Sequence, residues 1–351
     1  MKKIAYIEID THVEIAQAFM NIMEGSQHFA VDYYFSKKIK DQVIINDQTV
    51  YLSDSSMISE QLKAKEYDLV LIGTVHRFFN TFLAITEKCR TAVISHNLNF
   101  TKASKWDLMK SVFKEDLIYR LKLWWKEGLF YAPEVYRKSG SLLVLDQGMS
   151  SERHLFLPLF FTQNFEKAEN KSLTIVIPGG VSQKRRDYVH IVKTIGNMRD
   201  AGHYTFVFLG KAKDHELKHL KHLSAQLPRN IQIIYFSERV PAKDFESWMQ
   251  KADVLWCPIQ QETEFFSMKE VYGITKMTGN LGDAIAYGKL AIFPPSYPSE
   301  LAWIVPEKNI PHQFREISEL QVDFHTTYCK EEVQKRAEAV LSHLSGIENP
   351  G

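Results

Sequence analysis

Three histidines follow short apolar runs that are typical of strands in the N-terminal half of the sequence. Asp10 and His12 follow KIAYIEI, His76 follows YDLVLIG, and His96 follows TAVIS. Parallel strands end at one edge of their sheet, where open α/β folds bind ligands, so we expect these side chains to lie together. Histidines or a carboxylate there could deprotonate an acceptor hydroxyl or bind sugar hydroxyls. Taken singly, each histidine is better explained as a hydrogen-bonded loop residue.

The histidines do not have the spacing of a metal site. His12, His76 and His96 are not spaced as in HExxH, and no cysteine accompanies them. Cys89, Cys257 and Cys329 are far apart and form no CxxC pair, which argues against a disulfide framework and favours a reducing compartment. We therefore expect a cytoplasmic protein that needs no metal and no cofactor.

A second group of candidate residues follows an apolar run in the C-terminal half. In TIVIPGGVSQKRRDY, a predicted strand leads into Gly179 and Gly180 and then into three cations, Lys184, Arg185 and Arg186. A tight turn followed by cations suits a diphosphate. Neither GxxxxGK[ST] nor GxGxxG is present, so an ordinary strand-to-helix turn with a solvated basic face would explain the same residues.

A nucleoside could bind at the same predicted edge. In the run IQIIYFSERV, four apolar and charged residues lie at or just after the end of the predicted strand. They are Phe236, Glu238, Arg239 and Val240. Backbone groups and an apolar wall there could bind a planar base.

The stretch EVYGITKMTGNLGDAIAYGK, from Glu270 to Lys289, combines acids, glycines and a lysine within an apolar run. We expect an anion site at the N-terminus of the helix that ends near Tyr287, because backbone amides and the helix dipole favour negative charge there. The candidate ligands are Lys276, Thr278, Gly279 and Asn280. Alternatively, Asn280 and Asp283 form a simple capping box and Lys276 is solvated.

The spacing of these runs predicts an α/β protein. Short β-rich runs alternate with segments of helical periodicity, as in parallel sheets covered by helices. The alternation breaks between Asp146 and Ser172. We predict two Rossmann-like domains facing each other across a cleft, residues 1–167 and 168–351. The last segment, EEVQKRAEAVLSHL, has an apolar stripe and is expected to pack back on the N-terminal domain.

The C-terminal motifs resemble those of the GT-B glycosyltransferases, and most nearly the glycosyl transferases of group 1, which are family 4-like. The matching segments are IVIPGGVSQKRRDY, TFVFLGKA, ADVLWCPI and the stretch from Glu270 to Lys289. This last stretch is similar to the family pattern E-x-F-G followed by E-A-x-A-x-G-x-P. It differs in having extra residues between the two acids, Asp283 in place of the second Glu, and Leu290 in place of Pro.

This resemblance implies roles for individual residues. Glu270 would touch the donor sugar, Asp283 the ribose hydroxyls, and His96 the donor sugar from the other domain. The N-terminal half matches by topology alone, since the family's glycine-rich first loop is replaced by EIDTH. Asp10 or His12 would then face the acceptor and serve as base if the enzyme inverts the anomeric centre. The resemblance implies an acceptor domain at 1–167 and a donor domain at 168–351.

The predicted function is a metal-independent glycosyltransferase. It would move a hexose-type sugar from a nucleoside diphosphate sugar to a saccharide or lipid-linked acceptor in cell-surface polysaccharide or glycolipid assembly. The sequence contains no DxD, the metal-diphosphate motif of the other major glycosyltransferase architecture. Two alternatives remain, a nucleotide-sugar epimerase of the same fold and a non-catalytic nucleotide-sugar-binding scaffold subunit.

A basic segment from Lys102 to Tyr131 has the pattern of a membrane-surface helix. It carries Trp106, Phe113 and Trp124 at helical intervals, and its lysines outnumber its acids. Such helices can lie on an anionic leaflet, here the inner face of the membrane, although an internal helix would show the same spacing. No window approaches the roughly 18 apolar residues of a spanning helix. With 43 Lys and Arg against 42 Asp and Glu, the charge balance gives no case for nucleic acid.

Overall fold

The computed structural model describes residues 1–351 except 115, 164–171, 200, 309, 311 and 347–351. The chain divides into two compact units. The first comprises Met1–Phe160, Glu264–Met277 and Lys330–Gly351, and the second comprises Phe161–Thr263 and Thr278–Cys329. The predicted boundary between residues 167 and 168 lies outside the described residues. Residues Glu264–Met277, which the sequence analysis assigned to the C-terminal domain, belong instead to the first unit.

The first unit is built on a seven-stranded parallel sheet in the order β3-β2-β1-β4-β5-β6-β7. Its strands are β1 (Lys2–Glu8), β2 (Phe29–Phe35), β3 (Thr49–Leu52), β4 (Leu69–Ile72), β5 (Thr91–Ile94), β6 (Ser141–Val144) and β7 (His154–Phe156). The strands β4 and β5 are buried along their whole length, because helices cover both faces of the sheet. The strand order reverses between β1 and β4, which makes the carboxyl ends of these two strands the expected ligand edge.

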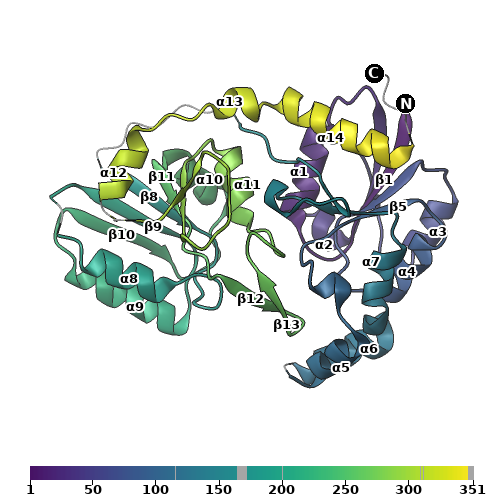
Figure 1. The fold of residues 1–351 in the computed structure, drawn as a ribbon, viewed down its shortest axis with the longest axis horizontal. Helices are drawn as coiled ribbons and strands as arrows, with labels where there is room; N and C mark the ends of the chain where they lie inside the picture. Colours follow the sequence, from purple (N-terminus) through teal and green to yellow (C-terminus); the bar gives the residue numbers. More distant parts are fainter. Residues whose placement is uncertain (115, 164–171, 200, 309, 311, 347–351) are drawn as a thin grey trace. The chain divides into compact units, whose positions relative to one another are not determined.

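Helices cover both faces of this sheet, with α1 and α14 on one face and α3, α4 and α7 on the other (Figure 1). The helices of the unit are α1 (Val13–Met23), α2 (Lys37–Lys40), α3 (Ile58–Lys63), α4 (Phe79–Thr86), α5 (Lys105–Lys114), α6 (Leu117–Glu127), α7 (Ala132–Lys138) and α14 (Lys330–Ser345). Short 3-10 turns occur at η1 (Phe100–Lys102), η2 (Leu129–Tyr131) and η3 (Gln147–Met149).

The C-terminal helix α14 packs on the first unit, as predicted. Val333, Ala337 and Leu341 form its buried stripe, and the helix contacts α1. The Ser26 hydroxyl donates a hydrogen bond of 2.6 Å to Glu338.

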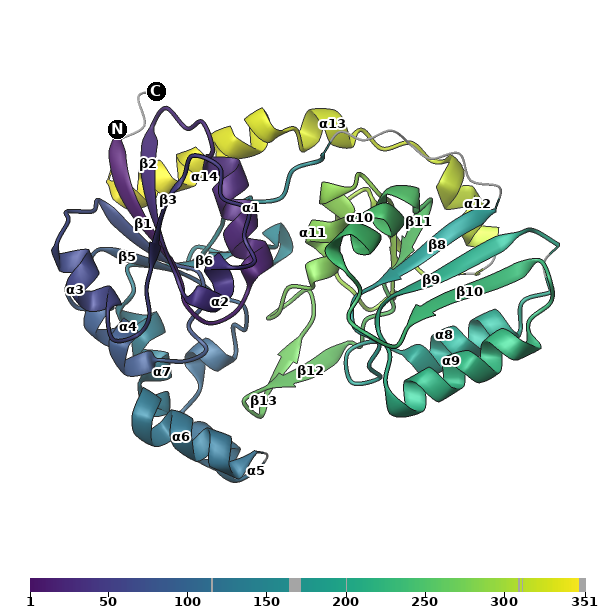
Figure 2. The same cartoon turned by 180° about the vertical axis from the view of Figure 1, so that it is seen from behind.

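The second unit contains a six-stranded parallel sheet in the order β10-β9-β8-β11-β14-β15. Its strands are β8 (Leu173–Pro178), β9 (Tyr204–Lys211), β10 (Ile231–Phe236), β11 (Val254–Trp256), β14 (Ala291–Phe293) and β15 (Ile304–Pro306). Its helices are α8 (Tyr188–Gly196), α9 (Asp214–Gln226), α10 (Ala242–Lys251), α11 (Gly279–Ala286), α12 (His312–Glu319) and α13 (Phe324–Thr327). Figure 2 shows α8 and α9 side by side on one face of the sheet, with α10 and α11 on the other.

A two-stranded hairpin, β12 (Glu262–Phe265) and β13 (Met268–Val271), begins the segment that joins the first unit. Phe265, Phe266 and Met268 pack against the apolar core of that unit. The Leu98 amide also donates a hydrogen bond of 2.8 Å to the Thr275 carbonyl. Burial of apolar side chains therefore decides which unit this segment joins.

Candidate functional site

The three histidines of the first unit form a cluster at the carboxyl ends of β1, β4 and β5. The rings of His12 and His96 are stacked, with centroids 4.1 Å apart and planes 15° apart. The ring of His76 lies edge-on to both, 5.6 Å from each. The convergence predicted from the strand ends is therefore confirmed.

Two of these histidines are held neutral. Burial, and then the neighbouring His12 and cationic groups, keeps the pKa of His76 and of His96 well below the ordinary histidine value. Nε2 of His96 lies 2.9 Å from the Gly73 carbonyl oxygen, so this nitrogen carries the ring proton. Nδ1 of His96 is then the nitrogen that can accept a hydrogen bond.

His12 is paired with a carboxylate that the sequence analysis did not single out. Nδ1 of His12 lies 2.9 Å from Oε1 of Glu14, in the first turn of α1. A carboxylate on Nδ1 orients an imidazole so that Nε2 is its basic nitrogen, which is the arrangement of a general base. His12 also has a left-handed backbone, with φ of 61°, and such strain in a non-glycine residue clusters at functional sites. The His-x-Glu spacing at a helix start was the available signal.

A buried glutamate supports the loop that carries Asp10 and His12. Glu8 is fully buried in β1, and its carboxyl group accepts the amide N–H of Asp10 and of Thr11 at 3.2 Å. The Thr74 hydroxyl donates to it at 2.6 Å. Burial raises the pKa of Glu8 to about 8. Through these hydrogen bonds, Glu8 connects the loop after β1 to the loop after β4.

Asp10 lies beside this cluster in a partly buried position. Burial raises its pKa, although Arg77, whose Nη1 lies 3.8 Å away, acts in the opposite direction. A carboxylate with a raised pKa is the better proton acceptor, so Asp10 remains a candidate base beside His12.

The segment 264–277 brings Glu270 and Lys276 to the first unit. Glu270 is fully buried, and its two oxygens accept the amide N–H groups of Phe100 at 2.9 Å and Asn99 at 3.3 Å. Burial raises its pKa. Glu270 thus anchors the segment, whereas the resemblance predicted that it touches the sugar. The ammonium group of Lys276 donates to Oδ1 of Asn97.

The predicted anion-site residues Lys276, Thr278, Gly279 and Asn280 fall on both sides of the boundary between the two units, which lies between Met277 and Thr278. Lys276 belongs to the first unit and contributes to the depression of the histidine pKa values. The other three residues belong to the second unit. Local sequence patterns do not indicate this boundary, because it falls inside the motif that runs from Glu270 to Lys289.

In the second unit, Arg186 is fixed at the carboxyl end of β8. Its Nη2 donates to Oδ1 of Asn280 at 3.1 Å, and its Nη1 donates to the Gly180 carbonyl at 3.3 Å. Gly179 has a φ of 102°, which is strained for residues with a side chain, and a Cβ there would lie 2.3 Å from Nη2 of Arg186. The structure thus brings these four predicted residues together. Lys184 and Arg185 are exposed instead.

The N-terminus of α11 lies beside this arginine. Thr278 is the N-cap, its hydroxyl accepting the Asn280 amide at 3.4 Å. Asn280 is buried in the first turn of α11. Its side-chain NH2 group, unlike the backbone N–H that bonds Thr278, donates to the Pro178 carbonyl and to the Asp283 carboxylate, both at 3.2 Å. The alternative capping box starting at Asn280 is therefore wrong. A Cβ at Gly180 or Gly279 would meet no atom within 4 Å, so the backbone is open to a ligand at both positions.

The predicted nucleoside-binding residues lie two strands from β8, at the end of β10. Phe236 ends that strand and is half-buried, as is Val240, while Arg239 is exposed. Glu238 pairs with the ammonium group of Lys211, the last residue of β9, at 2.6 Å. The carboxylate of Asp283 accepts a hydrogen bond of 3.2 Å from the side-chain amide of Asn280.

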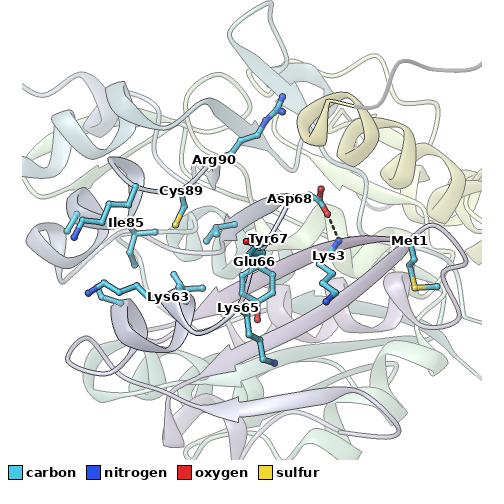
Figure 3. A pocket seen from close by; sticks show the side chains of 15 residues that line it. Met1, Lys3, Lys63, Lys65, Glu66, Tyr67, Asp68, Ile85, Cys89 and Arg90 are labelled. Carbon is cyan, nitrogen blue, oxygen red and sulfur yellow. Dashed lines mark hydrogen bonds between the residues drawn. The ribbon is translucent and has the colours of Figure 1, made fainter.

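A pocket of about 700 Å³ occupies the opposite edge of the first sheet, where β1 and β4 begin (Figure 3). Lys3, Tyr67, Cys89 and Arg90 are among its lining residues, and the Lys3 amide donates to Asp68 at 2.8 Å. The histidines follow the other ends of these strands, so this pocket is separate from the candidate site.

The described residues offer no ready metal site. Among them, no group of three or more His, Cys, Asp or Glu side chains is placed to hold a metal ion. The cationic and amide groups around Arg186 suit an anion.

Comparison with protein families and with curated proteins finds no match to this sequence. Solved structures do match over almost the whole chain. HepE of Anabaena in complex with UDP-glucose has a TM-score of 0.58 and 11% identity, covering 98% of this chain and 100% of HepE. The lipopolysaccharide outer core galactosyltransferase WaaB, in its apo form, has a TM-score of 0.54 and 13% identity, covering 97% and 99%. The UDP-GlcNAc 2-epimerase of Methanocaldococcus jannaschii has a TM-score of 0.52 and 9% identity, covering 97% and 99%.

The chain therefore has the GT-B fold, as the resemblance of the C-terminal motifs predicted. Two parallel-sheet α/β units are its defining feature, and both are present here. Identities of this size establish the fold, and the chemistry has to be argued from the residues.

Proposed function

We propose that this protein is a metal-independent glycosyltransferase that moves a hexose-type sugar from a nucleoside diphosphate sugar to a saccharide or lipid-linked acceptor. The observation that carries the proposal is the histidine cluster with its His12–Glu14 pair at the ligand edge of a GT-B sheet. HepE, solved with UDP-glucose, and the galactosyltransferase WaaB support the donor and reaction class. Cell-surface polysaccharide or glycolipid assembly is the proposed setting.

On the acceptor side, His12 is the proposed general base. Its Nε2 takes the proton of the acceptor hydroxyl while Glu14 stabilises the resulting imidazolium. The neutral rings of His76 and His96 line the position of the sugar and add no competing positive charge. If transfer retains the anomeric configuration, no such base is required, and the three rings serve to position the sugar.

On the donor side, the leaving diphosphate gains negative charge as the glycosidic bond breaks. Arg186 and the amides at the start of α11 would stabilise that charge without a metal, because fixed donors need no rearrangement during the reaction. Phe236 and Val240 would contact the base, and Asp283 the ribose hydroxyls. Lys276, which belongs to the same unit as the three histidines, would contact the donor sugar.

A binding experiment tests this proposal. UDP, GDP, ADP, CMP and dTDP are each titrated into the wild type and Arg186→Gln by calorimetry and thermal shift, with Lys184→Gln as the matched control. One nucleoside diphosphate is expected to stabilise the wild type by mass action. Loss of charge-assisted hydrogen bonds worth about 1.5–3 kcal/mol should weaken it about 10- to 100-fold in Arg186→Gln. Lys184→Gln should bind like the wild type. Absence of binding by all five nucleotides would contradict the proposal.

The second candidate function is nucleotide-sugar epimerisation, favoured by the similarity to the UDP-GlcNAc 2-epimerase. The two functions differ in what happens without an acceptor. An epimerase converts the nucleotide sugar into its epimer, which proton NMR detects directly. A transferase leaves the configuration of the donor sugar unchanged until an acceptor is added.

The α5–α6 hairpin is the proposed site of peripheral membrane contact, at the cytoplasmic face. It projects from the first unit away from the sheet (Figures 1 and 2). The alternative of an internal helix does not fit its exposed side chains, because Trp125 is 88% exposed, Ile118 87% and Trp106 68%. No described helix has the length and apolar character needed to cross a bilayer. Exposed aromatic residues among lysines suit an anionic leaflet.

Vesicle sedimentation tests this contact. Wild type should bind vesicles that contain phosphatidylglycerol, and Ile118→Ser with Trp125→Ser should lose most of that binding. Leu320→Ser, at an exposed apolar residue far along the chain, is the control. Equal binding by all three proteins would remove the hairpin from the proposal.

A further inference from the structure

Arg77, in the loop after β4, lies between two carboxylates of the first unit, Glu127 and Asp10. Its Nε donates to Oε2 of Glu127 at 2.9 Å, and its Nη2 donates to Oε1 at 2.5 Å. Its Nη1 lies 3.8 Å from Oδ1 of Asp10, which is too far for a hydrogen bond. Two parallel bonds to one carboxylate fix both the position and the orientation of a guanidinium group. Glu127 therefore determines where Arg77 lies relative to Asp10.

Glu127 is itself fixed by the fold. It is the last residue of α6, at the end of the α5–α6 hairpin, and only 5% of its surface is exposed. Its Oε2 also accepts the amide N–H of Phe78, which precedes α4, at 3.4 Å. Gly128 follows with a φ of 72°, and a Cβ there would lie 2.8 Å from Tyr131 and 3.2 Å from Asn80 in α4. The end of α6 is thus packed closely against the start of α4.

The carboxylate of Asp10 has no hydrogen-bond partner among the described residues. The ammonium group of Lys38 donates to the backbone carbonyl of Asp10 instead, at 3.1 Å. Only 12% of the Asp10 side chain is exposed, yet neither of its oxygens is completely covered by other atoms. A largely buried carboxylate without a donor is costly, and a hydroxyl group of a ligand would supply the missing donor.

The charged and titratable groups that face Asp10 come from several elements. They are Glu8 in β1, His12 at the start of α1, Lys38 in α2, Arg77 after β4, and Tyr119 and Glu127 in α6. Burial raises the pKa of Asp10, whereas Arg77 and Lys38 lower it. The negative charge of Glu127 raises it. Closer approach of Arg77 would favour the ionised form of Asp10 and would occupy the oxygens that a hydroxyl needs.

We propose that Glu127 is a positioning residue for the ligand edge after β1, β4 and β5. It holds Arg77 away from Asp10, so that the Asp10 carboxylate stays free to accept a hydrogen bond from a hydroxyl of the acceptor. This role rests on the proposed transferase function, which supplies that acceptor. Without the charge of Glu127, Arg77 would need to move only about 1 Å to bond Asp10 directly, at the usual distance of about 2.8 Å.

The test is a double-mutant cycle on the full chain, with Glu127→Gln, Arg77→Gln and the variant that carries both. Titration of the Asp10 carboxyl group is followed by carbon-13 NMR, with its signal assigned by Asp10→Asn. Arg77→Gln removes a neighbouring cation and should move the titration to higher pH. This rise should be larger in the Glu127→Gln background, where Arg77 bonds Asp10, than in the wild-type background. Equal rises in the two backgrounds would overturn the proposal.

Glu134→Gln is the matched control, because it also removes a glutamate from an ion pair with an arginine. Glu134 pairs with Arg137 at 3.2 Å within α7 and does not contact Asp10 or Arg77. The Asp10 titration should be the same in this variant as in the wild type. If Glu134→Gln moves it as far as Glu127→Gln does, the effect is one of general charge and the proposal is wrong.

A kinetic measurement tests the contact with the acceptor, using the acceptor to which the wild type transfers sugar. In Glu127→Gln its KM should rise about tenfold or more, as expected for loss of a hydrogen bond to a charged group. KM should fall back in the double variant, in which Arg77 no longer occupies Asp10. KM for the nucleotide sugar should stay unchanged, because Glu127 lies outside the Arg186 site.

A wild-type acceptor KM in Glu127→Gln would show that Asp10 does not bind the acceptor hydroxyl, and would also overturn the proposal. Failure of the proposed function gives a different result. In that case the wild type transfers no sugar, whereas the NMR cycle still shows whether Glu127 holds Arg77 away from Asp10.

Discussion

The ligand edges of the two sheets are built differently. In the first unit, the edge after β1, β4 and β5 is crowded with imidazole rings, two of them held neutral by burial. In the second unit, the edge after β8 has a fixed arginine beside open glycine backbone and a helix N-terminus. Both edges follow from parallel strands, so the topology sets the location and the side chains set the chemistry. The carboxylate-paired imidazole of His12 suits proton transfer, while a held cation and exposed amides suit an anion.

Removal of the proposed base should have the largest effect. His12→Gln should lower the rate of sugar transfer by about 10²- to 10⁴-fold, the usual contribution of general base catalysis. Nucleotide affinity should stay unchanged, because His12 belongs to the other edge. The measurement is nucleoside diphosphate release in the presence of acceptor, alongside calorimetry. A His12→Gln variant with the wild-type rate would show that His12 is not the base.

Substitution of the fixed arginine should have the next largest effect. Arg186→Lys keeps the charge but loses the geometry that reaches both Gly180 and Asn280. Diphosphate affinity should fall roughly tenfold, less than in Arg186→Gln, as measured by calorimetry. If the lysine variant binds as the wild type does, charge alone accounts for the site and the fixed position of the guanidinium is unimportant.

The adjacent glycines provide a matched pair for stability. Gly179→Ala should lower the free energy of unfolding by about 1–3 kcal/mol, because its positive φ is strained for alanine and the methyl group would meet Arg186. Gly180→Ala meets no atom within 4 Å and should change stability by less than about 0.5 kcal/mol. Urea unfolding midpoints measure both. Similar losses in the two variants would contradict this description of the turn.

Glu8 should leave a smaller signature in the pH dependence of stability. Its pKa in the folded protein is about 8, above the ordinary value of 4.5. Between these values the folded state holds a proton that the unfolded state has lost, so the free energy of unfolding falls as pH rises. Below the ordinary pKa both states are protonated, and this contribution is fully present.

Glu8→Gln should therefore flatten the pH profile between about pH 5 and about pH 8. Urea unfolding at intervals across that range provides the comparison with wild type. Identical slopes in the two proteins would mean that Glu8 is ionised in the folded state.

The sequence was sufficient to predict the parallel sheets, and with them the convergence of His12, His76 and His96. That convergence follows from topology, since parallel strands end at a common edge. It also predicted that Arg186 and Asn280 belong to one site. It could not separate Thr278 from Asn280 as the N-cap, because both residues cap helices well and the choice depends on the bond from Asn280 to the distant Pro178 carbonyl.

Local sequence patterns could not predict which of the two units residues 264–277 belong to. The segment joins the first unit because Phe265 and Phe266 pack on a core formed by residues much earlier in the chain. Glu270 and Lys276 belong to this segment, so their hydrogen-bond partners lie in the first unit. The pairing of His12 with Glu14 was missed for a different reason, because an acidic residue in the first turn of a helix is common for the helix dipole alone.

The central claim is that this GT-B protein transfers a sugar from a nucleoside diphosphate. The most direct measurement is proton NMR of the protein with the nucleotide sugar of whichever diphosphate binds, with and without a mixture of saccharide and lipid-linked acceptors. The account predicts a new glycosidic anomeric signal only when acceptor is present, in equal amount to the diphosphate released. An epimerised nucleotide sugar in the absence of acceptor, or no change in either sample, would contradict it.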